Sequence, residues 1–253
     1  MTSLSVFFLG TGAAMPISRG LPCIAVRIDS NIYLLDVGEG CQQRLFRMGL
    51  SPLKINSIMI THLHGDHYLG VLGLFQTMHL SGRKMPLYIY APRDFRVLIG
   101  KLVELRLLKI DFPVEIIDLE DGVEYNDNKV VITAFPVSHG IEAYGFEVNV
   151  RRPRIKIVYT GDTSPCENVI EHAHNADLLI HDSTFTSDLA KEAHEQGHST
   201  AKDAALVALK AGVDTLVLTH ISARYDDPLE LFYDAYRYFP RVIVAEDYMV
   251  IKY

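Results

Sequence analysis

The sequence has no long apolar run: nowhere do about 18 consecutive hydrophobic residues occur, the length that a helix needs to cross a membrane. The early apolar stretch LSVFFLG, residues 4–10, is short and no Lys or Arg precedes it. We therefore expect a strand there rather than a signal peptide, and no membrane partner.

Positive charge and cysteine are also scarce. The 24 Lys and Arg residues are outnumbered by 31 Asp and Glu residues, which gives a net charge of -7. Such a chain is not predisposed to coat nucleic acid, so RNA binding would need a local basic patch. The three cysteines, Cys23, Cys41 and Cys166, are widely separated and odd in number. They suggest a reducing cytoplasm and no disulfide framework, and none has the spacing of a cysteine zinc site.

What is present is a large, ordered, α/β-type chain of 253 residues, 49% of them hydrophobic. Strands are expected at 4–9, 23–28, 31–36, 55–60, 86–92, 114–119, 130–136, 144–149, 155–160, 177–181, 214–219 and 242–245. Helices are expected at 38–49, 68–80, 94–108, 167–175, 200–211 and 228–238. This alternation favours sheet packed on sheet with helices outside. Without a linker or repeat, we expect one domain, 1–253, of two similar halves that meet near residue 120.

The stretch THLHGDHYLG, residues 61–70, places three histidines and an aspartate within six positions. His62 and His64 are two apart at the end of an apolar strand, so their side chains point to the same side. Gly65 allows a sharp turn, and Asp66 and His67 follow. Imidazole and carboxylate converging from one loop are typical of zinc, iron or manganese ligands. A His-rich surface loop is the alternative, but three histidines behind a strand favour a metal site.

One loop cannot complete a hydrolytic metal site, so further ligands are expected at other strand ends. His139 in FPVSHG, Asp162 in IVYTGDTSP and His220 in LVLTHISARY each follow an apolar strand and a Thr, Ser or Gly. Taken singly, Asp162 is readable as an Asx-turn residue and the histidines as ordinary loop residues. Together with residues 62–67 they predict a single site.

These motifs resemble the metallo-β-lactamase superfamily, whose HxHxDH signature stands at residues 62–67. Within the superfamily, the chain looks like the ribonuclease Z family of tRNA 3′-processing endonucleases. The likeness covers nearly the whole chain, in the motifs FLGTGAAMP, LLDVGEG, THLHGDH, SHG, YTGDT, HDSTF, HST and THISARY. It implies a four-layer αββα sandwich.

The resemblance also implies two Zn²⁺ ions at the edge of the sandwich, with Mn²⁺ or Fe as possible substitutes. It assigns the ligands of one ion to His62, His64 and His139. It assigns the ligands of the other to Asp66, His67 and His220. Asp162 would bridge the two ions, and Asp66 would also act as general base toward the attacking water. Two metals that share a carboxylate suit the in-line displacement of a phosphoryl group.

The leaving ribose 3′-oxygen needs a proton, and His198 is the candidate donor with Asp182 as its orienting partner. The family commonly has Glu where Asp182 stands, so the pairing is one methylene shorter here. His198 is also readable as a helix-start residue in a polar loop. Arg224 and Ser199 are candidate substrate contacts, although a surface role for Arg224 is nearly as plausible.

The largest departure from the family is the missing flexible arm that grips tRNA. Only 22 residues, 140–161, separate His139 from Asp162. The stretch VRRPRIKI instead offers a small basic turn in which Arg152 is a candidate contact to RNA backbone; a solvated turn is an equal alternative. After Pro16, the stretch ISRGLPC lacks the usual Arg-Asn pair.

We therefore expect a zinc-dependent endoribonuclease that removes the 3′ trailer of precursor tRNA and leaves a 3′-hydroxyl. The alternative is a hydrolase of the same fold that acts on a smaller phosphodiester, cyclic nucleotide or sulfate ester. A di-iron redox protein would need an electron carrier that the sequence does not provide, and a purely RNA-binding module would need degenerate ligands. The expected partner is precursor tRNA or another RNA, and the resemblance suggests a homodimer.

Overall fold

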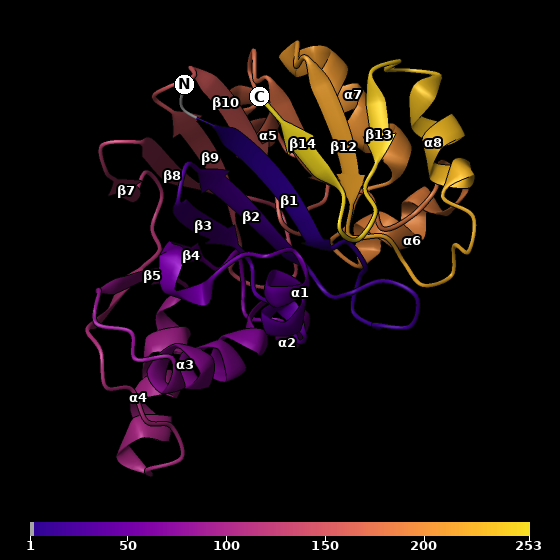
Figure 1. Cartoon of the computed structure of the whole chain (residues 1–253). Helices are drawn as coiled ribbons and strands as arrows, with labels where there is room; N and C mark the ends of the chain where they lie inside the picture. The colour runs from indigo at the N-terminus through magenta and orange to yellow at the C-terminus, as the bar shows by residue number, and fades with distance from the viewer. Residues whose placement is uncertain (1–2) are drawn as a thin grey trace.

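The computed structural model describes residues 3–253 and contains two seven-stranded sheets (Figure 1). The first sheet has the strand order β14-β1-β2-β3-β4-β5-β6. Its strands are β1 (Leu4–Gly10), β2 (Cys23–Ile28), β3 (Asn31–Leu35), β4 (Ile55–Met59), β5 (Leu87–Ala91), β6 (Val114–Asp118) and β14 (Val250–Lys252). β3, β4, β5 and β6 run parallel to one another.

The second sheet has the order β13-β12-β11-β10-β9-β8-β7. Its strands are β7 (Glu124–Asn126), β8 (Val130–Pro136), β9 (Tyr144–Val150), β10 (Ile155–Tyr159), β11 (Leu178–Asp182), β12 (Thr215–Thr219) and β13 (Val242–Val244). β10, β11, β12 and β13 are parallel. The chain passes from the first sheet to the second between Asp118 and Glu124, and only its last strand returns.

A shared hydrophobic core lies between the sheets. Val6 and Phe8 of β1 pack in one cluster with Ile157 of β10 and Val217 of β12. The alternate residues of β1, such as Phe7, belong to a second cluster on the other side of the first sheet. Because both faces of β1 are covered, all seven of its residues are buried.

Helices cover the two outer faces. The helices α1 (Cys41–Arg47), α3 (Gly70–Leu80) and α4 (Arg93–Glu104) pack on the first sheet, with η1 (Pro52–Lys54) and α2 (Gly65–Tyr68) nearby. The helices α5 (Glu167–His172), α7 (Ala201–Ala211) and α8 (Leu229–Tyr236) pack on the second, and the short elements η2 (Ser187–Leu189) and α6 (Ala190–Glu195) lie between α5 and α7 in the chain. The layers are therefore helix, sheet, sheet, helix, as in Figure 1, which confirms the predicted αββα sandwich.

Helix α7 begins and ends as its sequence predicts. The Thr200 hydroxyl accepts from the Asp203 N–H, and the Asp203 carboxylate accepts from the Thr200 N–H. Gly212 ends the helix with φ +67°, a left-handed conformation that glycine adopts without strain. Elsewhere the expected helix 68–80 begins only at Gly70, because α2 forms a separate short turn before it.

Two expectations about the rest of the chain have different outcomes. No helix among the described residues is long and apolar enough to cross a bilayer. The expectation that the cysteines form no disulfide framework is wrong in part, because Cys23 and Cys41 form a disulfide between β2 and the start of α1. Both are fully buried and close in space although 18 residues apart, so only Cys166 is free.

The topology brings the expected site residues to one edge. β10, β11 and β12 are parallel, and β8 has the same direction because both β8 and β10 are antiparallel to β9. The carboxyl ends of these strands therefore meet, and the Tyr144 N–H that donates to the Thr61 carbonyl (3.0 Å) joins that edge to the end of β4. Parallel strands commonly build sites at this end.

Candidate metal centre

The HxHxDH segment begins at His62, three residues after the end of β4. His62 is fully buried, His64 precedes the first residue of α2, and Asp66 and His67 lie within that short helix. Gly161 supports this arrangement from the second sheet: its φ is +58°, and a Cβ there would lie 2.7 Å from the Thr61 side chain. Asp162 can therefore approach the histidines only because its neighbour is glycine.

A first group of ligand atoms comes from both sheets. His62 Nε2 lies 3.0 Å from His64 Nδ1, and His139 Nε2 lies 3.2 Å from the same atom. Asp162 Oδ2 is 3.6 Å from His62 Nε2. One ligand atom from each of these four residues lies within 4.8 Å of the others, which suits a metal ion.

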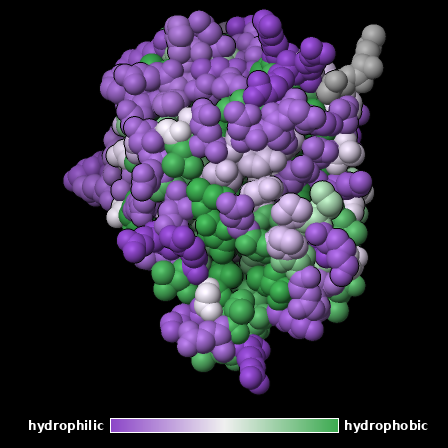
Figure 2. Space-filling model, turned by 90° about the vertical axis from the view of Figure 1, so that its left-hand side faces the viewer, coloured by the Kyte–Doolittle hydropathy of each residue, from purple (hydrophilic) through white to green (hydrophobic). Residues whose placement is uncertain are grey.

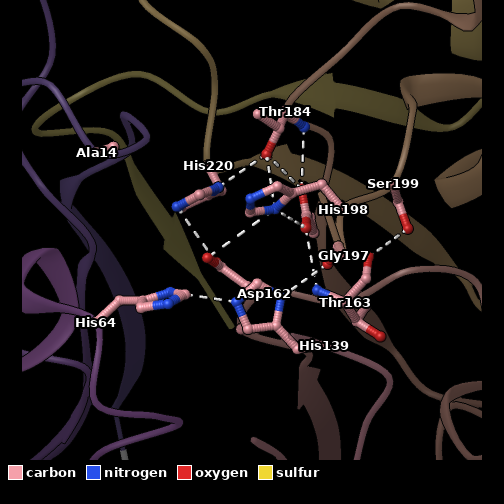
Figure 3. A network of polar contacts seen from close by, with 12 residues as sticks. Ala14, His64, His139, Asp162, Thr163, Thr184, Gly197, His198, Ser199 and His220 are labelled. Atoms are coloured by element: carbon pink, nitrogen blue, oxygen red, sulfur yellow. Dashed lines mark hydrogen bonds and ion pairs between the residues drawn. The ribbon is translucent and has the colours of Figure 1, made fainter. Parts of the chain in front are cut away.

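A second group lies on the other side of the same carboxylate. Asp66 Oδ2 is 3.5 Å from His67 Nε2 and 3.5 Å from His220 Nε2. Asp162 Oδ1 is 3.3 Å from His67 Nε2 and 3.2 Å from His220 Nε2. Asp162 therefore presents one oxygen to each group of histidines (Figure 3 shows it at the centre, among His64, His139 and His220).

Further contacts fix the direction of the histidine rings. His67 Nδ1 donates to Asp36 Oδ2 (2.8 Å), and His139 Nδ1 donates to the Gly197 carbonyl (2.8 Å). His220 Nδ1 contacts the Thr184 hydroxyl at 2.8 Å. In each of these rings a hydrogen bond engages Nδ1, and Nε2 faces the centre of the site. Histidines that bind a metal through one ring nitrogen commonly make such a hydrogen bond through the other.

Several polar atoms at the centre are buried without a hydrogen-bond partner among residues 3–253: His67 Nε2, Asp162 Oδ1 and His220 Nε2. Leaving such atoms unpaired is costly, and a cation would satisfy all three. The donor set of imidazole nitrogens and carboxylate oxygens matches zinc and similar transition metals. The residues present therefore fit a metal-binding site.

The electrostatics of the two groups differ. Burial lowers the pKa of His62 to about 2, and the neighbouring His67 adds to this, so His62 is neutral and can ligate a metal. Burial would lower the pKa of His67 too, but the negative charges of Asp162 and Asp36 outweigh it and raise that pKa. For Asp162, burial is outweighed by His220, His67 and His62, and the pKa falls well below its usual range. A metal ion would replace the proton on His67 Nε2.

Asp182 and His198 form a separate pair beside this centre. His198 Nδ1 lies 2.9 Å from Asp182 Oδ2, and Asp182 also accepts from the Thr163 N–H (3.0 Å) and the Thr184 hydroxyl (2.7 Å). Burial opposes a charge on His198, but Asp182 outweighs it and raises the pKa to about 9. The shorter Asp side chain thus reaches the histidine directly.

The three expected substrate contacts lie in different surroundings. Arg224 lies over the Phe185 ring (4.7 Å to its centroid) and pairs with Glu192 of α6 (3.2 Å), with Phe185 next to His198. The prediction that Ser199 contacts substrate does not fit its surroundings. Ser199 is fully buried and its hydroxyl donates to the Thr163 carbonyl (2.7 Å), so it supports the loop after Asp162. Arg152 lies in the turn before β10, at the opposite end of that strand from Asp162.

Sequence reasoning missed the residues that hold the ligands. Asp36 accepts from the Thr61 N–H (2.8 Å), the Tyr159 hydroxyl (2.8 Å) and His67, and it is fully buried. Its position directly after β3, before Val-Gly, is the same strand-end signal that identified Asp162 and His220. The Ala14 N–H, which donates to Asp66 Oδ2 (3.0 Å), has no such signal because any residue supplies a backbone N–H.

Comparisons with known proteins agree with this geometry. Residues 31–221 match the family described as beta-lactamase superfamily domain. Ribonuclease Z of Sulfurisphaera tokodaii is 37% identical over 98% of this chain and 99% of its own length, and ribonuclease Z of Methanothermobacter thermautotrophicus is 35% identical over 98% and 96%. The chain belongs to the ribonuclease Z family of the metallo-β-lactamase superfamily. It is therefore an endoribonuclease.

Solved structures extend the comparison. Human tRNase Z, short form, matches with a TM-score of 0.81 at 33% identity, over 98% of each chain. The metallo-beta-lactamase fold protein YhfI from Bacillus subtilis has a TM-score of 0.85 at 21% identity over the full length of both chains, and shows the fold alone. The alignment with the Sulfurisphaera enzyme spans 296 positions against 253 residues here, so at least 43 positions have no counterpart in this chain. The Sulfurisphaera enzyme therefore contains residues, in one or more insertions, that this chain does not have.

Proposed function

We propose that the chain is a two-metal phosphodiesterase that removes the 3′ trailer of precursor tRNA and leaves a 3′-hydroxyl. The observation that carries the proposal is the position of Asp162, with Oδ2 toward His62 and Oδ1 toward His67 and His220. A carboxylate shared between two ligand groups is the arrangement that two-metal phosphoryl transfer requires.

The proposed cofactors are two Zn²⁺ ions, for which Mn²⁺ or Fe can substitute. The proposed ligands of the first ion are His62, His64, His139 and Asp162. Those of the second are Asp66, His67, His220 and Asp162. Such ions supply Lewis acidity to the phosphate oxygens and lower the pKa of water.

Asp66 and His198 are the proposed proton-transfer residues. Burial would raise the pKa of Asp66, but the neighbouring His220 and His67 outweigh it and lower that pKa, so the carboxylate is ionised at neutral pH. Asp66 can therefore orient the attacking water and accept its proton. His198, held through Nδ1 by Asp182, can give a proton from Nε2 to the leaving 3′-oxygen.

Two arginines are proposed to contact the RNA backbone. Arg224 is preorganised by Phe185 and Glu192 beside His198, where its planar fork can reach a phosphate near the cut. Arg152 in the turn before β10 is proposed as a contact to a more distant phosphate, since it is exposed and has no ion-pair partner among residues 3–253.

The test is cleavage of an end-labelled precursor tRNA by metal-loaded protein, with Asp66→Ala and the small diester bis(p-nitrophenyl) phosphate in parallel. A single cut near the discriminator nucleotide, absent in Asp66→Ala, is the expected result. Turnover of the small diester with no RNA cut would overturn the tRNA assignment. The short stretch of 22 residues between His139 and Asp162, which leaves no room for a tRNA-binding arm, favours this second candidate, a phosphodiesterase with a smaller substrate.

We also propose a homodimer. Exposed apolar side chains gather on and just after α4, among them Val97, Val103, Leu105 and Leu107. Figure 2 shows hydrophobic residues gathered on the lower half of one face of the molecule. Contiguous apolar surface of this kind is typical of interaction sites. Light scattering with Leu105→Glu should give a monomer where the unmodified chain gives twice the mass; two equal masses would contradict the proposal.

A further inference from the structure

We propose that a hollow beside the metal centre binds the base of the nucleotide immediately 3′ of the cut, the first nucleotide of the released trailer. The inference rests on the proposed function, because it assumes RNA as the substrate. It assigns a specificity pocket to side chains that take no part in the metal site itself.

The hollow lies between the start of α1 and the start of α3 and has a volume of about 720 Å³. This lies within the range of about 300–1,000 Å³ that is common for small-molecule sites. Gly40, Gly70 and Gly73 are part of its lining and place no side chain in it. Its side-chain lining comprises Pro16, Glu39, Gln42, Gln43, Arg44 and Leu69.

One wall of the hollow is continuous with the metal centre. Leu69 is two residues after His67, whose carbonyl accepts from the Val37 N–H (2.7 Å). The Gly70 N–H donates to the Val37 carbonyl (3.0 Å), which ties the start of α3 to the same loop. On the opposite wall, Pro16 is two residues after Ala14, whose N–H holds Asp66. Two lining residues are therefore each only two positions from a residue that is part of the metal centre or contacts it.

The lining suits a planar base better than a phosphate. Pro16 and Leu69 are exposed apolar surfaces against which a base can pack. The Arg44 guanidinium is held by the Leu21 and Glu39 carbonyls (3.2 and 2.8 Å), so it offers a fixed plane for stacking. The carboxylate of Glu39 would repel a phosphate but can accept from a base amino group.

Two polar side chains remain available to read the base edge. Gln42 is already bonded to the Thr77 hydroxyl of α3. Gln43 and Glu39 are exposed, and their side chains have no hydrogen-bond partner among residues 3–253. An amide with both donor and acceptor groups next to a carboxylate can distinguish bases by their amino and carbonyl groups.

The position of the proton donor decides which nucleotide lies here. His198 must face the leaving 3′-oxygen, which belongs to the nucleotide 5′ of the cut. Figure 3 shows Ala14 and His64 on one side of Asp162 and Ser199 on the other, with His198 above the carboxylate. Because the hollow adjoins the Ala14 side, it is open to the nucleotide on the other side of the phosphate, the first of the trailer.

The first test measures binding without catalysis. Precursor RNA with 2-aminopurine as the first trailer nucleotide is titrated with metal-free protein, whose sequence contains no tryptophan to interfere with the emission. We expect the emission to change on binding, and to change at least about twofold less with Leu69→Ala, which removes one packing surface. The matched control Leu209→Ala, an exposed leucine on α7, should behave as the unmodified chain. Equal changes in all three proteins would overturn the inference.

The second test measures base preference. Four RNAs that differ only in the first trailer base are cleaved by the metal-loaded chain, by Gln43→Ala and by the control Gln76→Ala. We expect kcat/KM to vary about fivefold or more among the bases, the lower end of what a good base contact contributes, and the spread to shrink in Gln43→Ala alone. Equal rates for all four RNAs with no emission change would overturn the pocket while the proposed function stands. An emission change lost in Leu69→Ala, with no RNA cleaved, would support the pocket and overturn the proposed function.

Discussion

The two ends of the second sheet carry ionisable side chains in opposite surroundings. At the carboxyl ends of β10, β11 and β12, Asp162, Asp182 and His220 are at most 5% exposed and every one contacts another ionisable group. At the other end, the turn before β10 exposes Arg151 and Arg152 to solvent. Arg151 bonds to the Asn126 side chain (2.9 Å) and the Asp127 carbonyl (3.1 Å).

The difference shows what burial does to charge. Eight residues of extended chain, roughly 26 Å, separate Arg154 from Asp162, so neither end acts directly on the other. At the buried end, low polarizability makes each pairing strong, and the neighbouring histidines lower the pKa values of Asp162 and Asp182. At the exposed end, water and salt screen the arginines, and their interactions contribute little to the stability of the chain. Mutations at the two ends should therefore have effects of very different size.

The largest effect is expected for Asp162→Ala. Removal of the shared carboxylate leaves His67 and His220 facing one another, so we expect loss of bound metal and of RNA cleavage together. Metal content by mass spectrometry and cleavage of labelled RNA measure both. Arg152→Ala is the control from the other end and should keep its metal and its cleavage of a short substrate. Full metal content in Asp162→Ala would contradict the bridging role.

His198→Ala should have the next largest effect. We expect the metal content to be unchanged and kcat to fall by roughly 10²–10⁴-fold, the usual contribution of a general acid. The control His194→Ala, from an exposed histidine of α6 that pairs with Asp203, should keep full turnover. Unchanged turnover in His198→Ala would remove it from the mechanism.

A third prediction concerns Asp182→Asn. In the metal-free chain the pKa of His198 is about 9, raised by Asp182 against the effect of burial. The unfolded value is about 6.5. The raised pKa of His198 therefore contributes stability that is complete below about pH 6.5 and is lost as the pH rises through 9, and protonation of Asp182 removes the contribution of the pair in acid. NMR titration of the imidazole should give a lower pKa for His198 in Asp182→Asn. The same pKa in both proteins would show that Asp182 is not its partner.

The smallest effect is expected from replacing Arg151, Arg152 and Arg154 together by alanine. Free energy of unfolding should change little, because exposed charges contribute little to stability. RNA binding should weaken, and the slope of log affinity against log salt should fall by about one for each phosphate contact that is lost. Binding assays at several salt concentrations measure this slope. An unchanged slope would make the turn an ordinary solvated loop.

The sequence predicts which side chains cluster at this edge, because each candidate ligand follows the same local pattern, an apolar strand that ends in polar residues. The two-residue period of a strand was enough to predict that His62 and His64 point to the same side. The position after a strand was enough to select His139, Asp162 and His220. The hydrogen-bond partners of the candidate ligands are harder to predict, because Asp36 and Thr184 contact histidines that are 31 and 36 residues away in the sequence. Such contacts depend on how segments that are distant in the sequence pack together, and a local sequence pattern holds no information about this packing.

Other misses have equally physical reasons. Ser199 looks like a polar loop residue in the sequence, but it is fully buried in the fold and its hydroxyl donates to the Thr163 carbonyl. Cys23 and Cys41 are unremarkable in the sequence and meet only because β2 passes beside the start of α1. The three-residue strands β7 and β14 are too short to give a pattern of their own and form by pairing with longer neighbours.

The candidate ligands come from both sheets: His62, His64, Asp66 and His67 follow β4 of the first, and His139, Asp162 and His220 follow strands of the second. No half of the sandwich can assemble the full set alone. A bound cation would therefore link the two sheets, and its binding free energy would add to the free energy of unfolding. Chelators should lower the unfolding temperature as well as stop the reaction, so the catalytic metal would also be a structural part of the fold.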